Sequence, residues 1–234
     1  MRAPAIKTRA FLSQLALFQE ASGEELDRIA AGTTELRVPK GHMLFQRGDP
    51  CLGLHAVVYG QVKLAFVSPQ GSEKVVDIVG PGMSFGEALM FTGRPSVVYG
   101  QALVDSMLLH VSKAAIDTEI ERDPMLARRM IAGLSQRLHG LVQDVEGYSL
   151  RSGMQRVIGY LLRDIDVLAE PVAGGSAPLT VTLEVNKGVI ASRLNLTPEH
   201  FSRVLAELTQ EALIEVHGAK IVILDPVRIR DFLR

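Results

Sequence analysis

The chain has 234 residues, 47% of them hydrophobic, a formal net charge of −1 and a single cysteine, Cys51. This length allows one large or two ordinary domains with real cores, and the near-zero charge leaves room for a nucleic-acid site only as a local patch. One cysteine excludes a disulfide framework, an all-cysteine zinc site and a four-cysteine iron–sulfur cluster.

The N-terminal segment predicts helices and no leader sequence. Residues 1–18 begin basic, but Ser13 and Gln14 interrupt the apolar positions, which favours a short amphipathic helix over a signal peptide. Residues 11–31 follow a helical pattern, and Ser22 followed by Glu24 and Glu25 marks a second helix start. No apolar run reaches the roughly 18 residues of a membrane span. We therefore expect a cytoplasmic protein with no membrane partner.

Residues 34–111 alternate short β-rich runs with glycine turns. The runs are HMLFQ, HAVVYGQVKLAFV, EKVVDIV, VVYGQALV and SMLLHV. Evenly spaced short strands with glycine between them predict a small sandwich or barrel. The stretch PGMSFGEALMFTGRPSVV, residues 81–98, is interpreted as a bend of this sheet that could form part of a binding site.

A long helix is predicted to start at Asp123 and Pro124, with the aspartate as N-cap. Its apolar residues recur at intervals of three and four, which is typical of a two-stranded coiled coil. They are Ile131, Leu134, Leu138, Leu141, Val145 and Tyr148. The alternative is a helix packed on its own domain, but polar neighbours leave the apolar seam narrow, so we interpret it as a homodimer interface. After the break at residues 151–153, another helix is predicted to about Leu168.

The C-terminal region predicts a winged helix-turn-helix: a strand, two short helices, a β-hairpin and a closing helix. Asn186 and Thr197 are suitable N-caps for the two helices, and Pro198 suits the first turn of the second. Asn195 occupies the turn between them, where a positive φ is required. The apolar face of the second helix consists of Phe201, Val204, Leu205 and Leu208.

The opposite face of that second helix carries Glu199, Ser202 and Arg203, which share a face because they are three and four residues apart. Arginine pairs with guanine through two hydrogen bonds, and glutamate accepts from cytosine N4. The alternative is a solvated face with a Glu–Arg pair; the capped turn and the hairpin favour DNA. Further candidate DNA contacts, several of them to phosphate, are Thr197, His200, Lys187, His217 and Lys220.

Taken together, the chain resembles the Crp–Fnr superfamily of bacterial transcription regulators over nearly its whole length. The resemblance rests on the bend formed by Pro81, Gly82, Phe85, Gly86 and Glu87, the long helix and the winged helix. It implies an α+β fold with an N-terminal cyclic-nucleotide-binding-like β-roll (a double-stranded β-helix or jelly roll). The runs FGEALMF and EHFSRVL are most similar to the Dnr-type regulators of denitrification, a branch associated with nitric oxide sensing through haem.

The resemblance also implies a domain plan and partners. Residues 1–122 would form the sensor domain, 123–150 the dimerisation helix and 151–234 the DNA-binding domain. The protein would be a homodimeric transcription regulator, with activation among the roles expected, that binds double-stranded DNA at palindromic sites with TTGAT-like halves. It would also contact RNA polymerase.

Departures from the family pattern reduce the number of possible effectors. In cAMP-binding members an arginine and then a serine or threonine follow ten and eleven residues after the glutamate of the bend; here those places hold Val97 and Val98, and Arg94 lies three residues too early. A cyclic phosphate against two valines would leave its charge unpaired. The places that hold the purine in those members match Leu141 and Val142. We therefore do not expect cAMP.

The sequence predicts instead an apolar effector pocket between the β-roll and the long helix. Its predicted lining is Phe85, Gly86, Glu87, Val97, Val98, Leu138, Leu141 and Val142. Such a slot suits haem, with His139, His55 or His110 as the candidate axial ligands. Another apolar small molecule, or no ligand, is the alternative.

A cupin-type metalloenzyme is the main alternative from another functional class, since cupins share the double-stranded β-roll. A cupin metal site needs two histidines separated by one residue, then a glutamate and a further histidine. His42 and His55 are isolated, and no His-x-His occurs in the chain. A P-loop, a HExxH motif and a nucleophile elbow are also absent from the sequence. We expect that the protein is not an enzyme.

Overall fold

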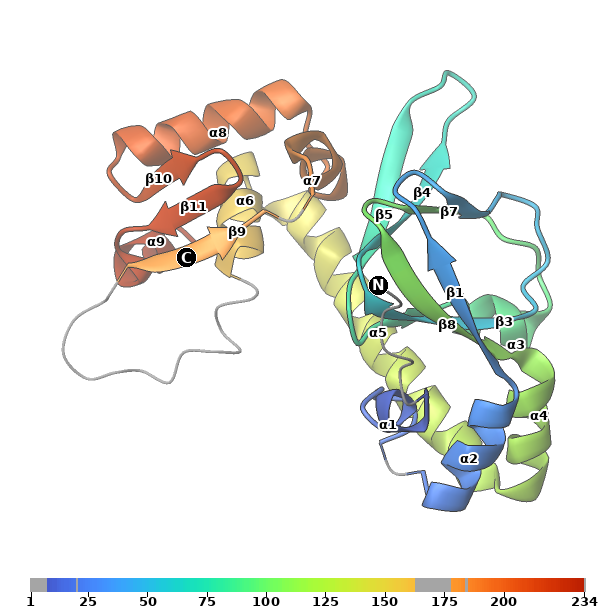
Figure 1. Ribbon diagram of the computed structural model, residues 1–234. Helices are drawn as coiled ribbons and strands as arrows, with labels where there is room; N and C mark the ends of the chain where they lie inside the picture. Colours follow the sequence, from blue (N-terminus) through green and yellow to red (C-terminus); the bar gives the residue numbers. More distant parts are fainter. Residues whose placement is uncertain (1–7, 20, 163–177, 184, 234) are drawn as a thin grey trace. The chain divides into compact units, whose positions relative to one another are not determined.

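The computed structural model describes residues 8–19, 21–162, 178–183 and 185–233 (Figure 1). The chain divides into two compact units, and the division falls between Gly140 and Leu141, inside the long helix α5 (Pro124–Leu150). The predicted division into residues 1–122, 123–150 and 151–234 stays a prediction. Within the described residues, no helix combines the length and the apolarity needed to cross a membrane.

The first unit is a β-roll flanked by helices (Figure 1). In its described residues the strands form two four-stranded antiparallel sheets, ordered β1-β8-β3-β6 and β2-β7-β4-β5. The strands are β1 (Thr33–Val38), β2 (Met43–Phe45), β3 (Gly53–Tyr59), β4 (Val62–Val67), β5 (Glu73–Val79), β6 (Ser84–Phe85), β7 (Tyr99–Ala102) and β8 (Ser106–Ser112). The helices are α1 (Thr8–Leu12), α2 (Gly23–Ala31), α3 (Glu87–Thr92), α4 (Lys113–Arg122) and the first part of α5.

The interior of the roll forms because strands of the two sheets turn apolar side chains toward each other. Val57, Val62 and Phe85 are among the residues buried in this core. The turn between β3 and β4 depends on Gly60, which has a φ of +88°. A Cβ atom at Gly60 would lie 2.1 Å from the Oγ of Ser106, so no side chain fits there.

A second core lies where the helices pack on the outer side of the roll, and buried ion pairs hold these helices together. Glu119 of α4 is only 2% exposed and accepts two hydrogen bonds from the Arg28 guanidinium of α2, at 2.8 and 2.9 Å. Arg129 of α5 pairs with Glu25 of α2 at 3.2 Å. Because two parallel N–H···O bonds fix both position and orientation, α2 and α4 are held in one arrangement.

The second unit is a winged helix-turn-helix. Its described elements are the last part of α5, α6 (Gly153–Leu162), β9 (Leu179–Thr182), α7 (Lys187–Arg193), α8 (Pro198–Gln210), β10 (Ile214–His217), β11 (Lys220–Ile223) and α9 (Pro226–Asp231). The described strands form a three-stranded antiparallel sheet in the order β10-β11-β9. One apolar core joins α6, α7, α8 and this sheet, with Val157, Ile190 and Phe201 fully buried. The predicted α+β fold, a β-roll followed by a winged helix, is thus confirmed.

The helix boundaries follow the capping residues named from the sequence. Ser22 forms a capping box with Glu25 at the start of α2, and Asp123 accepts from the backbone N–H of Met125 at the start of α5. The helix α5 ends at Leu150 and α6 begins at Gly153, so the predicted break at residues 151–153 is confirmed. The predicted end of α6 near Leu168 lies outside the described residues.

Three sequence-based interpretations were wrong or incomplete. Residues 13–19 form turns instead of continuing a helix from residue 11. The run Glu87–Thr92 is the helix α3 and not part of a sheet bend, because Gly86 and Gly93 at its two ends adopt positive φ values of 100° and 64°. The helix α4 was not predicted, although Ser112 caps it by accepting a hydrogen bond from the N–H of Ala115.

Candidate DNA-binding surface and sensor cavity

Capping and turn residues fix where the two helices of the helix-turn-helix begin. Asn186 accepts from the N–H of Val189 and begins α7, and Asn195 in the turn has the positive φ, 57°, that its position predicts. Thr197 accepts from the N–H of His200 at 3.2 Å and begins α8 at Pro198. These four capping and turn predictions are confirmed.

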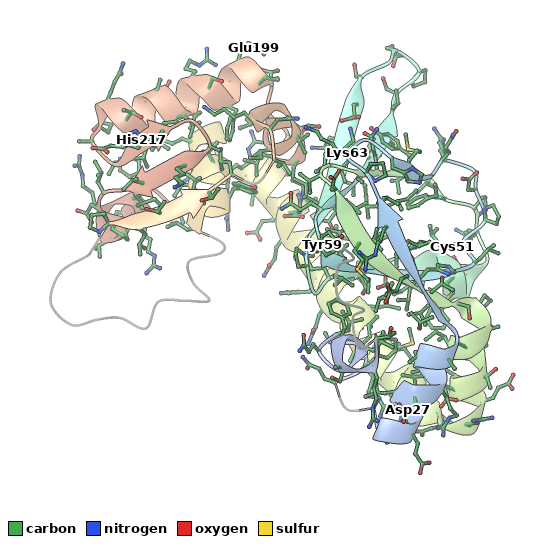
Figure 2. All side chains as sticks on the ribbon, in the orientation of Figure 1. Asp27, Cys51, Tyr59, Lys63, Glu199 and His217 are labelled. Carbon is green, nitrogen blue, oxygen red and sulfur yellow. The ribbon has the colours of Figure 1, made fainter. Side chains whose placement is uncertain are left out.

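The helix α8 separates its apolar and polar residues cleanly. Phe201 and Leu208 are fully buried, and Val204 and Leu205 are nearly so. Glu199, Ser202 and Arg203 are exposed on the other side, and Figure 2 shows Glu199 near the beginning of α8. The structure thus brings the three predicted reading residues together on one accessible face. Their contact with DNA stays a prediction.

The β10–β11 hairpin forms the wing. Gly218, with a φ of 64°, closes the turn, so His217 and Lys220 lie opposite each other at the tip. Both side chains are exposed, and His217 Nε2 lies 3.1 Å from a carboxylate oxygen of Glu215 (Figure 2). Lys187 is partly buried in the first turn of α7. As phosphate contacts, these residues remain predictions.

His200 differs from its neighbours on α8 because its side chain points back onto α6. A Cβ atom added to Gly153 would lie 2.8 Å from the Nε2 atom of His200 and 3.3 Å from a methyl carbon of Leu196. Close by, Arg156 of α6 donates to the carbonyl of Asn195 at 3.4 Å. The first turn of α6 therefore supports both the turn and the beginning of α8.

A second support comes from α5 and was not foreseen from the sequence. Arg193 at the end of α7 pairs with Asp144 of α5 at 2.5 Å, and the Arg193 side chain is only 11% exposed. Removing one partner of such a pair destabilises the folded protein, because the other charge stays unpaired. The pair fixes α7 to the last part of α5.

The predicted dimer seam of α5 is largely accessible in the single chain. Ile131, Leu138 and Val145 are each more than 60% exposed, Leu141 is 42% exposed, and Leu134 is half-buried. The side chain of Tyr148 lies outside the described residues. A row of exposed large apolar side chains on one helix is typical of a protein–protein contact. The dimer assignment stays a prediction.

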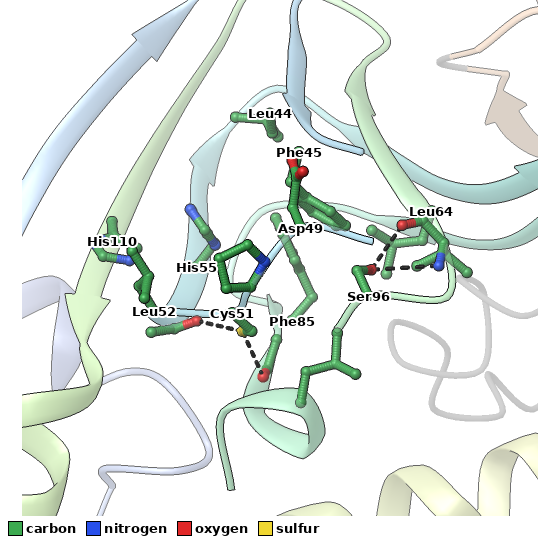
Figure 3. Close-up of a pocket in the computed structure, with 15 residues that line it drawn as sticks. Leu44, Phe45, Asp49, Cys51, Leu52, His55, Leu64, Phe85, Ser96 and His110 are labelled. Carbon is green, nitrogen blue, oxygen red and sulfur yellow. Dashed lines mark hydrogen bonds between the residues drawn. The ribbon is translucent and has the colours of Figure 1, made fainter. Parts of the chain in front are cut away.

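The β-roll contains a cavity of about 300 Å³. Its walls come from β2, the loop before β3, β3 itself, β4, β6, the start of α3, the segment before β7, and β8 (Figure 3). The lining residues are Leu44, Phe45, Asp49, Pro50, Cys51, Leu52, Gly53, His55, Leu64, Phe85, Gly86, Leu89, Ser96, Val98 and His110.

The cavity agrees only in part with the predicted effector pocket. Phe85, Gly86 and Val98 line it. Glu87 is buried but does not line it, and Val97 is 66% exposed, away from the interior. The predicted α5 residues Leu138, Leu141 and Val142 are exposed. The predicted pocket between roll and dimer helix therefore stays a prediction, while the observed cavity lies within the roll.

Two candidate haem ligands, His55 and His110, meet in this cavity. They lie opposite each other on β3 and β8, with ring centroids 4.8 Å apart. On its other side the His55 ring stacks on Phe85 at 5.1 Å. Burial, together with the neighbouring His110, lowers the pKa of His55 to about 4. Burial also lowers the pKa of His110, so both imidazoles are uncharged at neutral pH.

The remaining polar groups of the cavity are mostly satisfied by the protein itself. Cys51 donates its S–H toward the carbonyls of Gly53 and Gly86, at 3.1 and 3.3 Å (Figure 3). Ser96 donates to the carbonyl of Val98 at 2.7 Å, and Asp49 accepts from the backbone N–H of residue 46 at 2.8 Å. The described lining contains no lysine or arginine.

Comparison with known proteins assigns both units. A cyclic nucleotide-binding domain matches residues 35–123, and a Crp-like helix-turn-helix domain matches residues 155–232. A relative from Mycobacterium tuberculosis, the CRP-like cAMP-activated global transcriptional regulator, is 25% identical over 221 residues, which cover 93% of this chain and 96% of the relative. The matched domains and relatives are those of transcription regulators and not of enzymes.

Solved structures lead to the same assignment. DNR from Pseudomonas aeruginosa is 31% identical, with a TM-score of 0.52 and 96% of each chain covered. FixK2 from Bradyrhizobium japonicum, at 23% identity, shares the fold with a TM-score of 0.74 over 86% of this chain and 96% of its own. The domains, their order and the 31% identity over almost the whole chain lead to one conclusion: the chain belongs to the Crp/Fnr family of transcription regulators.

Proposed function

We propose that this protein is a homodimeric, effector-responsive transcription regulator that uses α8 to read palindromic DNA with TTGAT-like half-sites. The observation that carries the proposal is the polar face of α8, where Glu199, Ser202 and Arg203 are exposed above a buried apolar face. Arg203 would pair with a guanine and Glu199 with a cytosine amino group. The proposal includes action in the cytoplasm, contact with RNA polymerase and membership of the Dnr-type branch, all of which the family resemblance implies.

The rest of the second unit would position α8 on the duplex. Lys187, His217 and Lys220 would contact phosphates, which fix the orientation of a protein on DNA without reading its sequence. A twofold dimer formed through α5 would place its two copies of α8 about 34 Å apart, in successive major grooves. Each half of a palindrome would then meet one α8.

The assignment is tested by measuring the affinity of Arg203→Ala for a fluorescent TTGAT palindrome and for a scrambled duplex. Losing a two-bond contact with guanine costs about 1–3 kcal/mol in discrimination, so the preference for the palindrome should fall by about tenfold or more. Arg228→Ala is the matched control, since Arg228 lies on α9 and pairs with Glu211. An unchanged sequence preference in Arg203→Ala would contradict the assignment of α8.

As effector, cAMP is not part of the proposal, although the relative from M. tuberculosis is named as cAMP-activated. The described lining of the roll cavity offers no cation to a phosphate, and a buried unpaired charge is strongly disfavoured. Titration with cAMP should therefore leave the affinity for DNA unchanged.

Haem sensing of nitric oxide follows from the resemblance to the Dnr-type branch, but the roll cavity does not fit haem. A tetrapyrrole is large for about 300 Å³, and its two carboxylates would find no lysine or arginine in the described lining. Haem held at His139, which is exposed on α5, remains a separate prediction. Reconstitution with haem tests it: a saturable Soret band with one haem per chain, shifted by nitric oxide and lost in His139→Ala, is the expected result for that site.

A further inference from the structure

The cavity in the roll is built from aromatic rings on one side. Phe45, Phe85 and His55 form a row, with centroid distances of 6.0 Å between the two phenylalanines and 5.1 Å between Phe85 and His55. His110 continues the row beyond His55 at 4.8 Å. The lining also includes the aliphatic residues Leu44, Leu64 and Leu89. Aromatic molecules gain from offset or edge-on packing against such rings, beyond the gain from burying apolar area.

The size of the cavity limits its occupant. About 300 Å³ lies at the lower end of the roughly 300–1,000 Å³ range of small-molecule pockets. A molecule of one or two rings fits within such a space, whereas a tetrapyrrole exceeds it.

The charges around the cavity limit the occupant further. Asp49 is the charged residue of the described lining, and its carboxylate is exposed at the edge. An anion would meet this carboxylate with no lysine or arginine in the described lining, and a cation would have to leave water for apolar walls. An uncharged molecule avoids both penalties.

The ring of His55 offers a polar group to such a molecule. Cys51 and Ser96 direct their donors to backbone carbonyls. Within the described residues, the contacts of the His55 ring are with the rings of Phe85 and His110, and its nitrogens make no hydrogen bond to protein. An imidazole ring can donate one hydrogen bond and accept another while uncharged.

We propose that this cavity is an effector site for a small uncharged aromatic molecule that packs against Phe45 and Phe85 and hydrogen-bonds to His55. The site lies wholly within the roll, so it is distinct from the pocket predicted between roll and dimer helix. As an effector site it rests on the proposed function as a regulator; as a binding site it does not depend on DNA recognition.

Three probes with the same two-ring system test the ligand class. The full-length protein is titrated by calorimetry at pH 7.5 with indole, which is uncharged, with indole-3-carboxylate, an anion, and with tryptamine, a cation. We expect saturable binding of one indole per chain and at least about tenfold weaker binding of both charged probes. Tighter binding of either charged probe would overturn the assignment of an uncharged ligand, and no saturable binding of indole would overturn the site.

Variants locate the binding. His55→Phe keeps an aromatic ring but removes the hydrogen-bonding nitrogens, so indole should bind about fivefold more weakly, the equivalent of one hydrogen bond. Val98→Phe, just before β7, should fill the cavity and abolish saturable binding. His42→Phe is the matched control, because His42 is exposed in the loop before β2 and does not line the cavity. Equal indole affinity in all three variants would place the binding elsewhere and refute the proposal.

DNA binding in the same samples separates this proposal from the proposed function. Affinity for the TTGAT palindrome is measured with and without saturating indole. Coupling between two sites is typically 5- to 150-fold, so we expect the affinity for DNA to change by about fivefold or more, and Val98→Phe to lose the change. If the protein binds the palindrome but indole binding or its effect on DNA is absent, the effector site is refuted and the regulator stands. If indole binds and the palindrome does not, the DNA assignment fails instead.

Discussion

His55 and His110 show how a β-ladder can keep two basic side chains uncharged. The antiparallel pairing of β3 with β8 places them opposite each other on one face, so protonating one disfavours protonating the other. Burial acts in the same direction and is the larger cause for His55. The result is a polar but uncharged end to an otherwise apolar cavity.

This arrangement predicts that stability depends on pH. The pKa of His55 is about 4 in the folded protein against 6.5 ordinarily, so the unfolded chain binds more protons between these values. The stabilisation is fully present above pH 6.5 and is lost as the pH falls toward 4. Between pH 7 and pH 5, His55 alone should lower the free energy of unfolding by about 2 kcal/mol.

The measurement is urea unfolding of the wild type and of His55→Phe at pH 7 and pH 5. The drop in stability on acidification should be about 2 kcal/mol smaller in His55→Phe, and His42→Phe should behave as the wild type. Equal drops in all three proteins would show that His55 is already accessible to protons in the folded state.

The sequence predicted part of the cavity lining, and the misses have a geometric cause. Val97 and Val98 were assigned together, but both lie in a bend before β7, where Val97 is exposed and only Val98 lines the cavity. Asp49 and Cys51 were not assigned because a loop brings them across from another part of the chain. Spacing along the sequence carries no signal for such a contact.

The contact between α6 and α8 can be tested at two glycines of α6, Gly153 and Gly159. In Gly153→Ala the new methyl group would collide with the His200 ring, 2.8 Å away, and the ring would have to swing off α6. Because that contact supports the beginning of α8, we expect weaker binding to the palindrome by about tenfold, measured by fluorescence anisotropy.

Gly159 of the same helix provides the control. A methyl group there would meet only an Arg151 nitrogen at 3.9 Å, an ordinary contact. Gly159→Ala should therefore leave DNA binding unchanged and raise stability by about 0.5–1 kcal/mol, as expected for alanine in a helix. The variant His200→Ala removes the same contact without a collision, so it should weaken binding to the palindrome by a similar factor, and adding Gly153→Ala to it should weaken binding no further. If His200→Ala binds the palindrome as the wild type does, the contact does not support α8.

The apolar seam of α5 can be tested by adding charge to it. The pair Leu134→Asp and Leu141→Asp would place four carboxylates at the seam of a dimer, so the protein should become monomeric by multi-angle light scattering. Gln136→Asp with Gln143→Asp adds the same charges at the same spacing on exposed positions off the seam and should remain dimeric. A dimer in both double variants would show that the subunits associate through another surface.

Capping residues made four of the helix starts predictable, whereas α4 was missed although Ser112 caps it. The helix starts at Ser22, Asp123, Asn186 and Thr197 were predictable because the capping hydrogen bond is local. In each case a side-chain oxygen accepts from a backbone N–H only two or three residues further along the chain. The run Glu87–Thr92 was mistaken for sheet because a helix of six residues is too short to display a 3.6-residue period. Its boundaries depend on the backbone conformation of Gly86 and Gly93.

The order of the β-roll and the winged helix was predictable because each has its own pattern: alternating short strands in the first, and a capped helix-turn-helix in the second. The way in which a bound molecule would alter DNA binding depends on the arrangement of the two units, which no local pattern records.

The dimer model makes a prediction about the DNA itself. The centres of the two half-sites should be one helical turn apart, about 10–10.5 base pairs. Inserting five base pairs between the halves turns one half-site to the opposite side of the duplex and should reduce affinity to that of a single half-site. A palindrome of the original spacing with an altered central sequence is the control. Retained affinity after the insertion would indicate that the two DNA-binding units are not held in fixed register.

Cys51 gives the protein a built-in chemical reporter. The chain contains no other thiol, so a thiol-reactive dye can label the chain at one defined position, in the lining of the roll cavity. The two carbonyls that accept from this thiol, those of Gly53 and Gly86, belong to the walls of the same cavity. Any molecule that enters should therefore change the rate of labelling, and a single rate constant would report occupancy without a radioactive ligand or a DNA assay.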